Sequence, residues 1–441
     1  MSHTIAAVST GNQVSAIGIL RLSGEGCIEI AEKVFSRPLH ETPNRLLVLG
    51  ELRDIQGRTI DQCMAVVSRA PHSYTGEDTV EFHCHGSPAV LAEGLRSLYA
   101  AGARPAQRGE FTKRAFLNGK LDLTQAEAVI DLIEADTADA AANAAGQVGG
   151  RLQKVLLPVY DHLTDLCSHF HAVLDYPDED IEDFGLSNYA ASLRSDAKSL
   201  YALLQTYGQG RILRQGVKTA IVGRPNVGKS SLLNALVGFD RAIVTDIPGT
   251  TRDTVEESVL AGSAGIHQTA DTVEAIGVDR SRKALEEADL VLFVCDGSVP
   301  LTAEDQAIIE ACLDAPQAIA LINKCDLGTQ VEPSALPFLN VIPISAATGD
   351  GLELLRGCID DLFAGESKCD GSILTNPRQY DACRRAYESL LSALQGLKLG
   401  VTPDALLLDV EAAMEAIGEV TGATVREDIT NRIFERFCVG K

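Results

Sequence analysis

Hydrophobic residues follow different spacings along the chain, and these spacings divide it into parts. Short continuous apolar runs at residues 290–296 and 318–322 are typical of strands buried in a parallel sheet, and residues 341–344 are predicted to form a third strand. On both sides of this part, apolar residues recur every three or four positions. They predict helices over residues 123–174, 190–207, 378–397, 404–420 and 425–437. Insertion of one domain into another is tolerated where chain ends lie close together, so we expect one helical bundle with an α/β domain inserted.

The first 118 residues carry β-rich runs without a regular strand–helix–strand order. The pattern predicts strands over residues 5–10, 15–24, 46–52, 64–68 and 78–84, and a helix over residues 88–101. This predicts an α+β domain. The expected division is an N-terminal domain (1–118), a discontinuous helical domain (119–215 and 366–441) and an inserted domain (216–365).

A phosphate-binding P-loop opens the inserted domain. A short apolar strand runs into Gly-Arg-Pro-Asn-Val-Gly-Lys-Ser at residues 223–230, and a helix follows. Glycines let backbone N–H groups curl around an anion, and the helix N-terminus adds positive potential. Lys229 is expected to reach the β- and γ-phosphates, and the Ser230 hydroxyl to bind Mg²⁺.

Two later motifs indicate which base is bound. The run at 318–322 is followed by Asn323-Lys324-Cys325-Asp326, and the run at 341–344 by Ser345-Ala346-Ala347. The Asp326 carboxylate can accept hydrogen bonds from N1–H and the 2-amino group of guanine, a pattern that adenine lacks. The nucleotide is therefore predicted to be GTP, bound to a Ras-like parallel sheet.

Composition limits location and partners. No apolar run is long enough for a membrane span, and residues 1–20 do not have the pattern of a signal peptide. Eleven dispersed cysteines suit a reducing cytoplasm. A net charge of −23 argues against broad electrostatic binding of nucleic acid, although a local basic strip could dock a folded RNA.

Several polar groups outside the nucleotide motifs have more than one interpretation. His83 and His85 share one face of a strand, and partners within the fold are favoured over a metal site because only two ligands converge. Lys113, Arg114 and Lys120 could form a solvated face or hold an anion. The acidic run at 177–183 is interpreted as a solvated loop.

Taken together, the motifs resemble the MnmE (TrmE) family of tRNA-modifying GTPases over nearly the whole chain. The resemblance rests on the nucleotide motifs and on residues 19–24, 75–78, 114–122 and 438–441. It implies a homodimer whose N-terminal domain binds 5-formyltetrahydrofolate or a related tetrahydrofolate. The positions that match the folate contacts are Arg21, Glu81, Lys120 and Lys441.

The resemblance also implies a reaction and a protein partner. With an FAD-containing MnmG (GidA) partner, in a heterotetramer or larger complex, such proteins install aminomethyl-type groups at C5 of the wobble uridine of certain tRNAs. Cys438 matches the functional cysteine of the family. Burial of a cysteine is less usual this close to a chain end, which weakens its interpretation as a core residue.

In this family K⁺ takes the place of an arginine finger, and the matching ligand positions are Asn226, Thr245, Ile247 and Thr250. Thr251 is the expected contact to Mg²⁺ and the γ-phosphate, and Glu274 matches the acid that orients the attacking water. The full set of expected GTP-binding residues is Asn226, Val227, Gly228, Lys229, Ser230, Ser231, Thr245, Asp246, Ile247, Pro248, Gly249, Thr250, Thr251, Gly265, Asn323, Lys324, Cys325, Asp326, Ser345, Ala346 and Ala347.

One motif departs from the family pattern. A GTPase domain needs Asp-x-x-Gly after a buried strand at its second switch, but residues 262–265 read Gly-Ser-Ala-Gly. The preceding run at 255–260 is too close to leave room for that strand. Several residues are therefore missing, through a deletion or an omitted segment. If the chain itself lacks them, we expect weakened Mg²⁺ and γ-phosphate sensing and poor hydrolysis. A measured mass of 46.9 kDa would show that the chain itself lacks them.

Two alternatives to a K⁺-dependent GTP hydrolase acting on tRNA follow from these observations. The first is a GTP-binding scaffold whose damaged second switch no longer supports hydrolysis. The second is a ribosome-assembly GTPase, which would leave the N-terminal domain and residues 438–441 unexplained. A folate-dependent transferase acting alone gives the GTP site no role.

Overall fold

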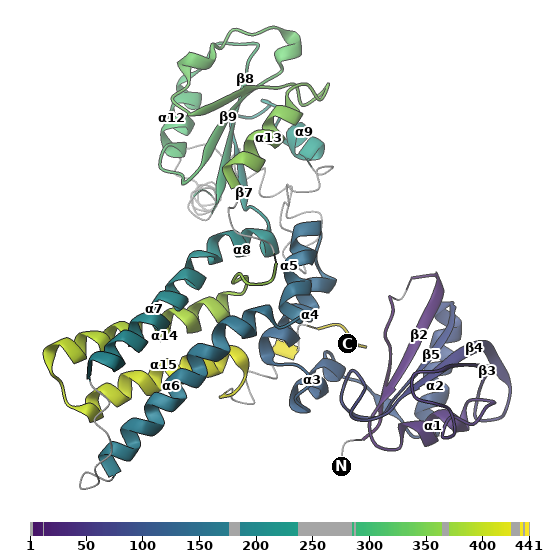
Figure 1. Ribbon diagram of the computed structural model, residues 1–441. Helices are drawn as coiled ribbons and strands as arrows, with labels where there is room; N and C mark the ends of the chain where they lie inside the picture. Colours follow the sequence, from purple (N-terminus) through teal and green to yellow (C-terminus); the bar gives the residue numbers. More distant parts are fainter. Residues whose placement is uncertain are drawn as a thin grey trace, which may run out of the picture.

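The computed structural model describes residues 3–11, 13–175, 186–236, 285, 288–363, 370–424, 433–434 and 437–440. Figure 1 shows a sheet with helices near the N-terminus, a group of long helices, and a second sheet that lies beyond α8 (Tyr207–Gln215). The acidic run at 177–183 lies outside the described residues. Of the predicted helix at 425–437, only residues 433, 434 and 437 are described.

The N-terminal part is a six-stranded mixed sheet in the order β3-β4-β5-β2-β1-β6. All neighbouring strands are antiparallel except β1 and β6, which are parallel. Leu20, Phe82 and Leu98 lie in the core between the sheet and the helices. The strands are β1 Ile5–Val8, β2 Ser15–Ser23, β3 Leu47–Arg53, β4 Thr59–Ser68, β5 Thr79–Gly86 and β6 Arg104–Pro105, and the helices are α1 Cys27–Lys33, α2 Pro88–Ala101 and α3 Glu110–Leu117.

The predicted α+β pattern is confirmed here. All five predicted strands form, and α2 has the predicted bounds. Helices α1 and α3 and the short strand β6 were not predicted. α1 and α3 each begin after a glycine with positive φ, at Gly26 and Gly109, and both helices are short.

Two groups of long helices, separated in sequence by the second sheet, pack together (Figure 1). Helices α6, α7, α14 and α15 share one hydrophobic core. The helices are α4 Leu123–Ile133, α5 Ala138–Val148, α6 Arg151–Asp175, α7 Leu186–Gln205, α8 Tyr207–Gln215, α14 Pro377–Leu399 and α15 Pro403–Thr421.

The continuous helix predicted over 123–174 is wrong in detail, because the chain breaks twice. Thr137 caps the start of α5 by accepting a hydrogen bond from the Ala140 N–H, and Gly150 adopts a positive φ of 76° before α6. The helix predicted to end at residue 207 ends close to it, because α7 ends at Gln205. A separate helix that was not predicted, α8, starts at Tyr207 and runs through Gly208 and Gly210 to residue 215.

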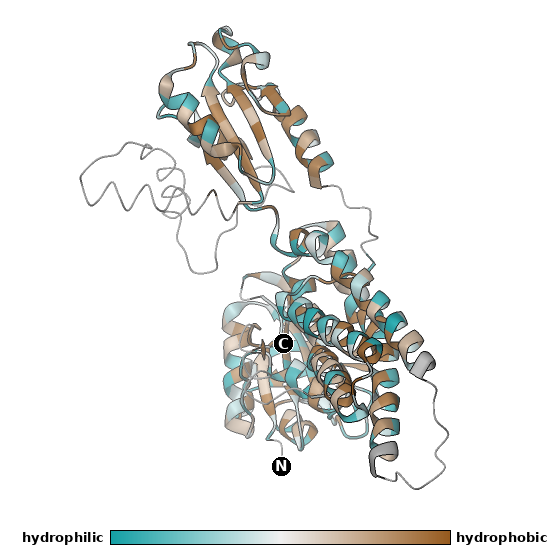
Figure 2. Ribbon diagram, turned by 90° about the vertical axis from the view of Figure 1, so that its left-hand side faces the viewer, coloured by the Kyte–Doolittle hydropathy of each residue, from teal (hydrophilic) through white to brown (hydrophobic). Residues whose placement is uncertain are grey.

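The described strands of the second sheet are all parallel, in the order β10-β9-β8-β7. The two predicted buried strands, β8 and β9, are confirmed, and the predicted third strand forms β10, in which only Ile342 is buried. Figure 2 shows the strands of this sheet as largely hydrophobic. The cluster on one face includes residues of α9 and α13, and that on the other face residues of α12. The elements are β7 Thr219–Val222, α9 Lys229–Leu236, β8 Leu290–Asp296, α12 Ala303–Cys312, β9 Ala318–Asn323, β10 Asn340–Pro343 and α13 Leu352–Phe363.

Candidate functional sites

The P-loop joins β7 to α9, as its sequence predicts. Gly223 and Gly228 have φ angles of 156° and 101°, and Asn226 between them has a φ of 65°, which is uncommon for a residue with a side chain. The Asn226 side chain is exposed, Val227 is buried, and Ser230 and Ser231 are exposed in the first turn of α9. The loop therefore has the tight curl that lets backbone N–H groups face an anion.

Lys229 lies inside this loop. Its ammonium donates hydrogen bonds to the carbonyl oxygens of Gly223 at 2.7 Å and Arg224 at 2.8 Å. The residue is buried, and burial lowers the pKa of its amine. An arriving phosphate would meet a positive charge that is already largely desolvated.

Asn323 connects the P-loop to the loop after β10. Its Nδ2 donates to the Val227 carbonyl at 2.7 Å, and its Oδ1 accepts from the Ala346 N–H at 3.0 Å. A side chain at Gly228 would place a Cβ 2.2 Å from Asn323 Nδ2, so this position requires glycine. The two motifs thus contact each other although almost a hundred residues separate them.

The remaining guanine-motif residues lie at the same edge of the sheet. Lys324 has a φ of 64°, and its Nζ pairs with Asp296 at the end of β8 at 2.6 Å. Asp326 is exposed in the short turn Cys325–Leu327, and the Cys325 N–H donates to the Ile344 carbonyl. Ser345 is buried, whereas Ala347 is exposed. Carboxyl ends of parallel strands are where α/β sheets bind ligands.

The other predicted nucleotide and cation residues are not described. They lie within residues 237–284, outside the described ranges, and comprise Thr245, Asp246, Ile247, Pro248, Gly249, Thr250, Thr251, Gly265 and Glu274.

A second polar site lies on the N-terminal sheet, on the face away from the core. Arg21 on β2 and Glu81 on β5 are register partners, and Arg21 Nε lies 2.6 Å from Glu81 Oε1. The Arg21 guanidinium also lies over the rings of Tyr74 and Phe111, at 5.6 and 5.7 Å from their centroids.

Tyr74 is a candidate site residue that sequence reasoning did not single out. Its hydroxyl lies 2.9 Å from Thr112 Oγ1, and burial raises the pKa of its phenol. It belongs to the run at 71–86, whose composition was unusual, but only the folded chain places it against Arg21.

Within the basic cluster of Lys113, Arg114 and Lys120, the side chains of Arg114 and Lys120 lie in different environments. Arg114 is buried and pairs with Glu77 at 2.8 Å and Glu110 at 3.0 Å, so it is a structural residue. Lys120 is exposed, and its side chain lies near Gly76, where a Cβ would stand 3.2 Å from its Cγ.

The histidines have partners within the fold, as favoured. His85 Nδ1 lies 2.8 Å from Asp61, and His83 Nε2 lies 3.5 Å from Glu81.

The C-terminal residues return to the N-terminal sheet. Ser9 Oγ donates to the Gly440 carbonyl at 2.9 Å, the Gly109 N–H donates to the Cys438 carbonyl at 3.3 Å, and Arg108 forms a β-bridge with Val439. The C-terminal marker in Figure 1 lies between the helices and this sheet. Cys438 is exposed, and Lys441 lies outside the described residues.

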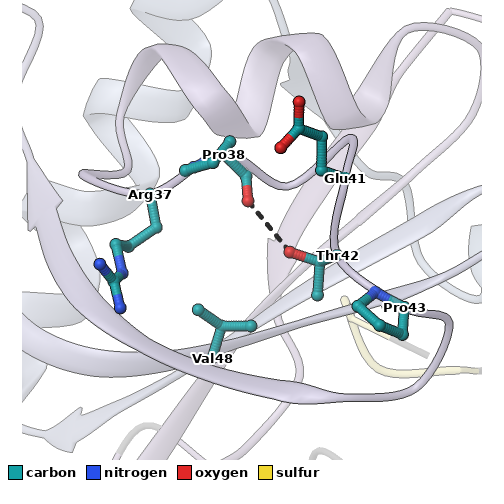
Figure 3. A pocket seen from close by; sticks show the side chains of 6 residues that line it. All are labelled: Arg37, Pro38, Glu41, Thr42, Pro43 and Val48. Carbon is teal, nitrogen blue, oxygen red and sulfur yellow. Dashed lines mark hydrogen bonds between the residues drawn. The ribbon is translucent and has the colours of Figure 1, made fainter.

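A surface hollow of about 280 Å³ lies beside β3, away from both sites (Figure 3). None of the predicted GTP or folate residues lines it, and its lining residues are Arg37, Pro38, Glu41, Thr42, Pro43 and Val48. Among the described helices, none is both long and apolar enough to span a membrane.

Comparison with known proteins identifies two family matches. The family described as "MnmE helical domain" matches residues 123–438, and "GTP-binding protein TrmE N-terminus" matches residues 4–120. Among solved structures, Aquifex aeolicus Era bound to GDP·AlF4⁻ covers 39% of this chain and 66% of its own at 24% identity, with a TM-score of 0.26, a similarity that adds nothing to the assignment.

Curated relatives match over the full length. A "tRNA modification GTPase MnmE" of Heliobacterium modesticaldum is 42% identical over 100% of both chains. Proteins of the same description from Roseiflexus castenholzii and Clostridioides difficile are 42% and 41% identical, over at least 99% of each chain. With two family matches and end-to-end identity above 40%, the chain belongs to the MnmE (TrmE) family of tRNA modification GTPases.

Proposed function

We propose that this chain is a K⁺-dependent GTP hydrolase that acts in modification of the wobble uridine (U34) of certain tRNAs. With an FAD-containing MnmG partner, it would install aminomethyl or carboxymethylaminomethyl groups at C5, using a tetrahydrofolate one-carbon donor. The observation that carries the proposal is the joining of the P-loop, the Asn323 turn and the Ser345 loop through the two hydrogen bonds of Asn323.

Each nucleotide residue has a distinct role in this proposal. The backbone of residues 226–230 cradles the phosphates, Lys229 exchanges its loop carbonyls for phosphate oxygens, and the exposed Asp326 carboxylate selects guanine. Glu274 would orient the attacking water. The remaining nucleotide contacts fall to Thr245–Thr251 and Gly265.

The proposed cation ligands suit hard cations. The Ser230 hydroxyl and the Asn226 amide are exposed at the P-loop, and oxygen donors suit Mg²⁺ and K⁺. Ser230 and Thr251 would hold Mg²⁺, and Asn226, Thr245, Ile247 and Thr250 would hold K⁺. When bound, the cations would neutralise charge on the β- and γ-phosphates.

The Arg21 site supports the folate part of the proposal. Arg21 is fixed by Glu81 and two aromatic rings, so its remaining N–H groups have a defined direction for an acyl or carboxylate oxygen. Arg21, Glu81 and the nearby exposed Lys120 would bind the tetrahydrofolate, with Lys441 completing the set. The return of residues 438–440 to this sheet supports a functional role for Cys438 close to the donor.

We propose that the chain has the domain organisation, location and partners that the family resemblance implies. The domains would be an N-terminal domain (1–118), a discontinuous helical domain (119–215 with 366–441) and an inserted GTPase domain (216–365). The protein would be a cytoplasmic homodimer that binds tRNA and MnmG. The single core shared by α6, α7, α14 and α15 supports the discontinuous helical domain.

Two experiments test the proposal. Multiple-turnover GTP assays in KCl and NaCl should give hydrolysis only with K⁺. Nucleosides from tRNA of cells lacking this gene should show unmodified wobble uridine, and a normal nucleoside profile would refute the role in modification.

A second candidate function, a GTP-binding scaffold with impaired hydrolysis, is favoured by the length of the relatives. The comparison with the Heliobacterium protein extends over 466 residues, whereas this chain has 441, so the relative contains residues without a counterpart here. This agrees with the segment missing before Gly265. Normal GTP affinity with no K⁺-dependent turnover would support the scaffold.

A further inference from the structure

Arg224, the second residue of the P-loop, reaches out of the loop to a different helix. Its Nε donates to Asp305 Oδ1 at 2.7 Å. Asp305 lies in the first turn of α12, and its side chain is 0% exposed, whereas that of Arg224 is 20% exposed. The pair therefore links the phosphate-binding loop to the helix that packs on the opposite face of the sheet from α9.

Both carboxylate oxygens of Asp305 accept hydrogen bonds. Its Oδ2 accepts hydrogen bonds from the N–H and the hydroxyl of Thr302, both at 2.9 Å, which leaves Oδ1 to Arg224. A buried carboxylate needs such partners, because an unpaired buried charge is costly. The direction of Asp305 is therefore fixed by the start of α12, and Asp305 in turn fixes the Arg224 side chain.

The same residue controls the loop backbone. The Arg224 carbonyl accepts one of the two hydrogen bonds from Lys229 Nζ, at 2.8 Å. Pro225 follows, which restricts the backbone of Arg224 to extended conformations. Asn226 then takes a positive φ, a conformation with an energetic cost for a residue with a side chain. Such a conformation persists when neighbouring contacts hold it.

We propose that the Arg224–Asp305 ion pair is a positioning device for nucleotide binding: it holds the first half of the P-loop in its phosphate-binding shape. This rests on the proposed GTP site. A loop held in its bound conformation loses less entropy when the ligand arrives, so loss of the pair should lower nucleotide affinity. Neither residue is among the expected nucleotide contacts.

A second Arg–Asp pair, between α8 and the parallel sheet, serves as a control. Arg211 on α8 pairs with Asp289 through two hydrogen bonds, of 2.6 and 3.1 Å, and the Lys218 N–H also donates to Asp289. Asp289 and Lys218 precede β8 and β7, at the amino ends of the parallel strands, opposite the nucleotide edge. Breaking this pair removes another Arg–Asp ion pair, somewhat more exposed than Arg224–Asp305, without touching the P-loop.

The test uses the full chain with a fluorescent GDP analogue and Mg²⁺, together with thermal melting. Arg224→Ala and Asp305→Asn should each raise the Kd about tenfold, mainly through faster dissociation. The double variant should bind the GDP analogue no more weakly than the weaker-binding single variant, because both substitutions remove the same interaction. Arg211→Ala should lower the melting temperature while the Kd stays within about twofold of wild type.

If Arg224→Ala does not fold, Asp305→Asn decides, since it keeps the size and one acceptor oxygen of the aspartate. Lower melting temperatures with unchanged Kd and dissociation rate in Arg224→Ala and Asp305→Asn would show a purely structural pair and overturn the positioning role alone. A wild-type chain that does not bind the GDP analogue would overturn the proposed function and the positioning role together.

Discussion

Cys438 differs from the other described cysteines in its exposure. Seven of them are buried, Cys325 and Cys358 are partly buried, and Cys438 alone among the described cysteines is exposed. Brief treatment of the folded protein with iodoacetamide should therefore modify Cys438 before any other described cysteine, and Cys438→Ser should remove that early modification. Peptide mass spectrometry identifies the modified residue. Earlier modification of another described cysteine would contradict this placement.

Asp131 on α4 is a buried acid at the contact between α4 and α8. Arg214 Nε donates to it at 2.8 Å, yet burial raises the pKa of its carboxyl to about 6. A pKa above the unfolded value means that the ionised carboxylate costs stability. That cost is present above about pH 6 and is relieved as the pH falls toward 3.8.

Asp131→Asn should therefore change stability in a pH-dependent way. The melting temperature of Asp131→Asn minus that of wild type should be higher at pH 7.5 than at pH 5. Asp289→Asn is the control: burial alone would raise the pKa of Asp289, but hydrogen bonds from Arg211 and Lys218 lower it. Asp289 stays ionised from pH 5 to 7.5. The difference in melting temperature between Asp289→Asn and wild type should therefore not change with pH. An equal pH response of the two variants would refute the shift at Asp131.

Helix α8 contains two glycines in different surroundings. A Cβ at Gly210 would lie 1.9 Å from the Leu374 carbonyl oxygen, whereas a Cβ at Gly208 would have no heavy atom within 4 Å. Because alanine is favoured over glycine in helices, Gly208→Ala should stabilise the protein by about 0.5–1 kcal/mol. Gly210→Ala should destabilise it by about 1–3 kcal/mol through overpacking. Chemical denaturation measures both, and equal effects would contradict the close packing at Gly210.

These glycines also show where sequence reasoning reaches its limit. Glycine disfavours helix interiors, and α8, which contains Gly208 and Gly210, was not predicted; the backbone of residues 374–375 packs directly on Gly210. A contact across more than 160 residues overrides local propensity. Tyr74 escaped notice for the same reason, because its partners Arg21 and Thr112 are distant in sequence.

The parts that could be predicted are those in which one short stretch determines the structure. The apolar runs of β8 and β9 are buried on both faces, and the P-loop takes its shape from its own glycines. Its contact with the Asn323 turn follows from the shared carboxyl edge of parallel strands. The link from Arg224 to Asp305 could not be predicted, because nothing in the sequence near Asp305 marks it as a partner.

Charge is unevenly distributed along the chain. Residues 1–118 contain twelve basic and twelve acidic residues, so the net charge of −23 belongs to residues 119–441. An anionic RNA would be repelled least by the N-terminal sheet, which also carries Arg21, Lys120 and the returning residues 438–440. This supports the proposal that the modification chemistry takes place at that sheet and GTP hydrolysis in the proposed inserted domain.

The environment of β7 in the parallel sheet is relevant to the segment that is missing before Gly265. Among the described strands β7 pairs only with β8, and Thr219, Ala220 and Ile221 are partly exposed, whereas all of β8 except its last residue is buried. A strand ending in Asp-x-x-Gly is the second-switch feature that residues 255–265 lack. The phosphate cradle and the guanine turn do not depend on that strand, so binding and hydrolysis should respond differently to its restoration.

Restoring the segment should raise turnover while leaving affinity nearly unchanged. We expect that inserting the corresponding residues of the Heliobacterium relative between Leu260 and Gly265 increases K⁺-stimulated kcat about a hundredfold, because a catalytic contact to developing charge is regained. The Kd for GDP should stay within about threefold, since Lys229, Asn323 and Asp326 are unchanged. A Gly-Ser insert of equal length controls for chain length alone. Equal turnover with both inserts would show that the segment's sequence is not what hydrolysis lacks.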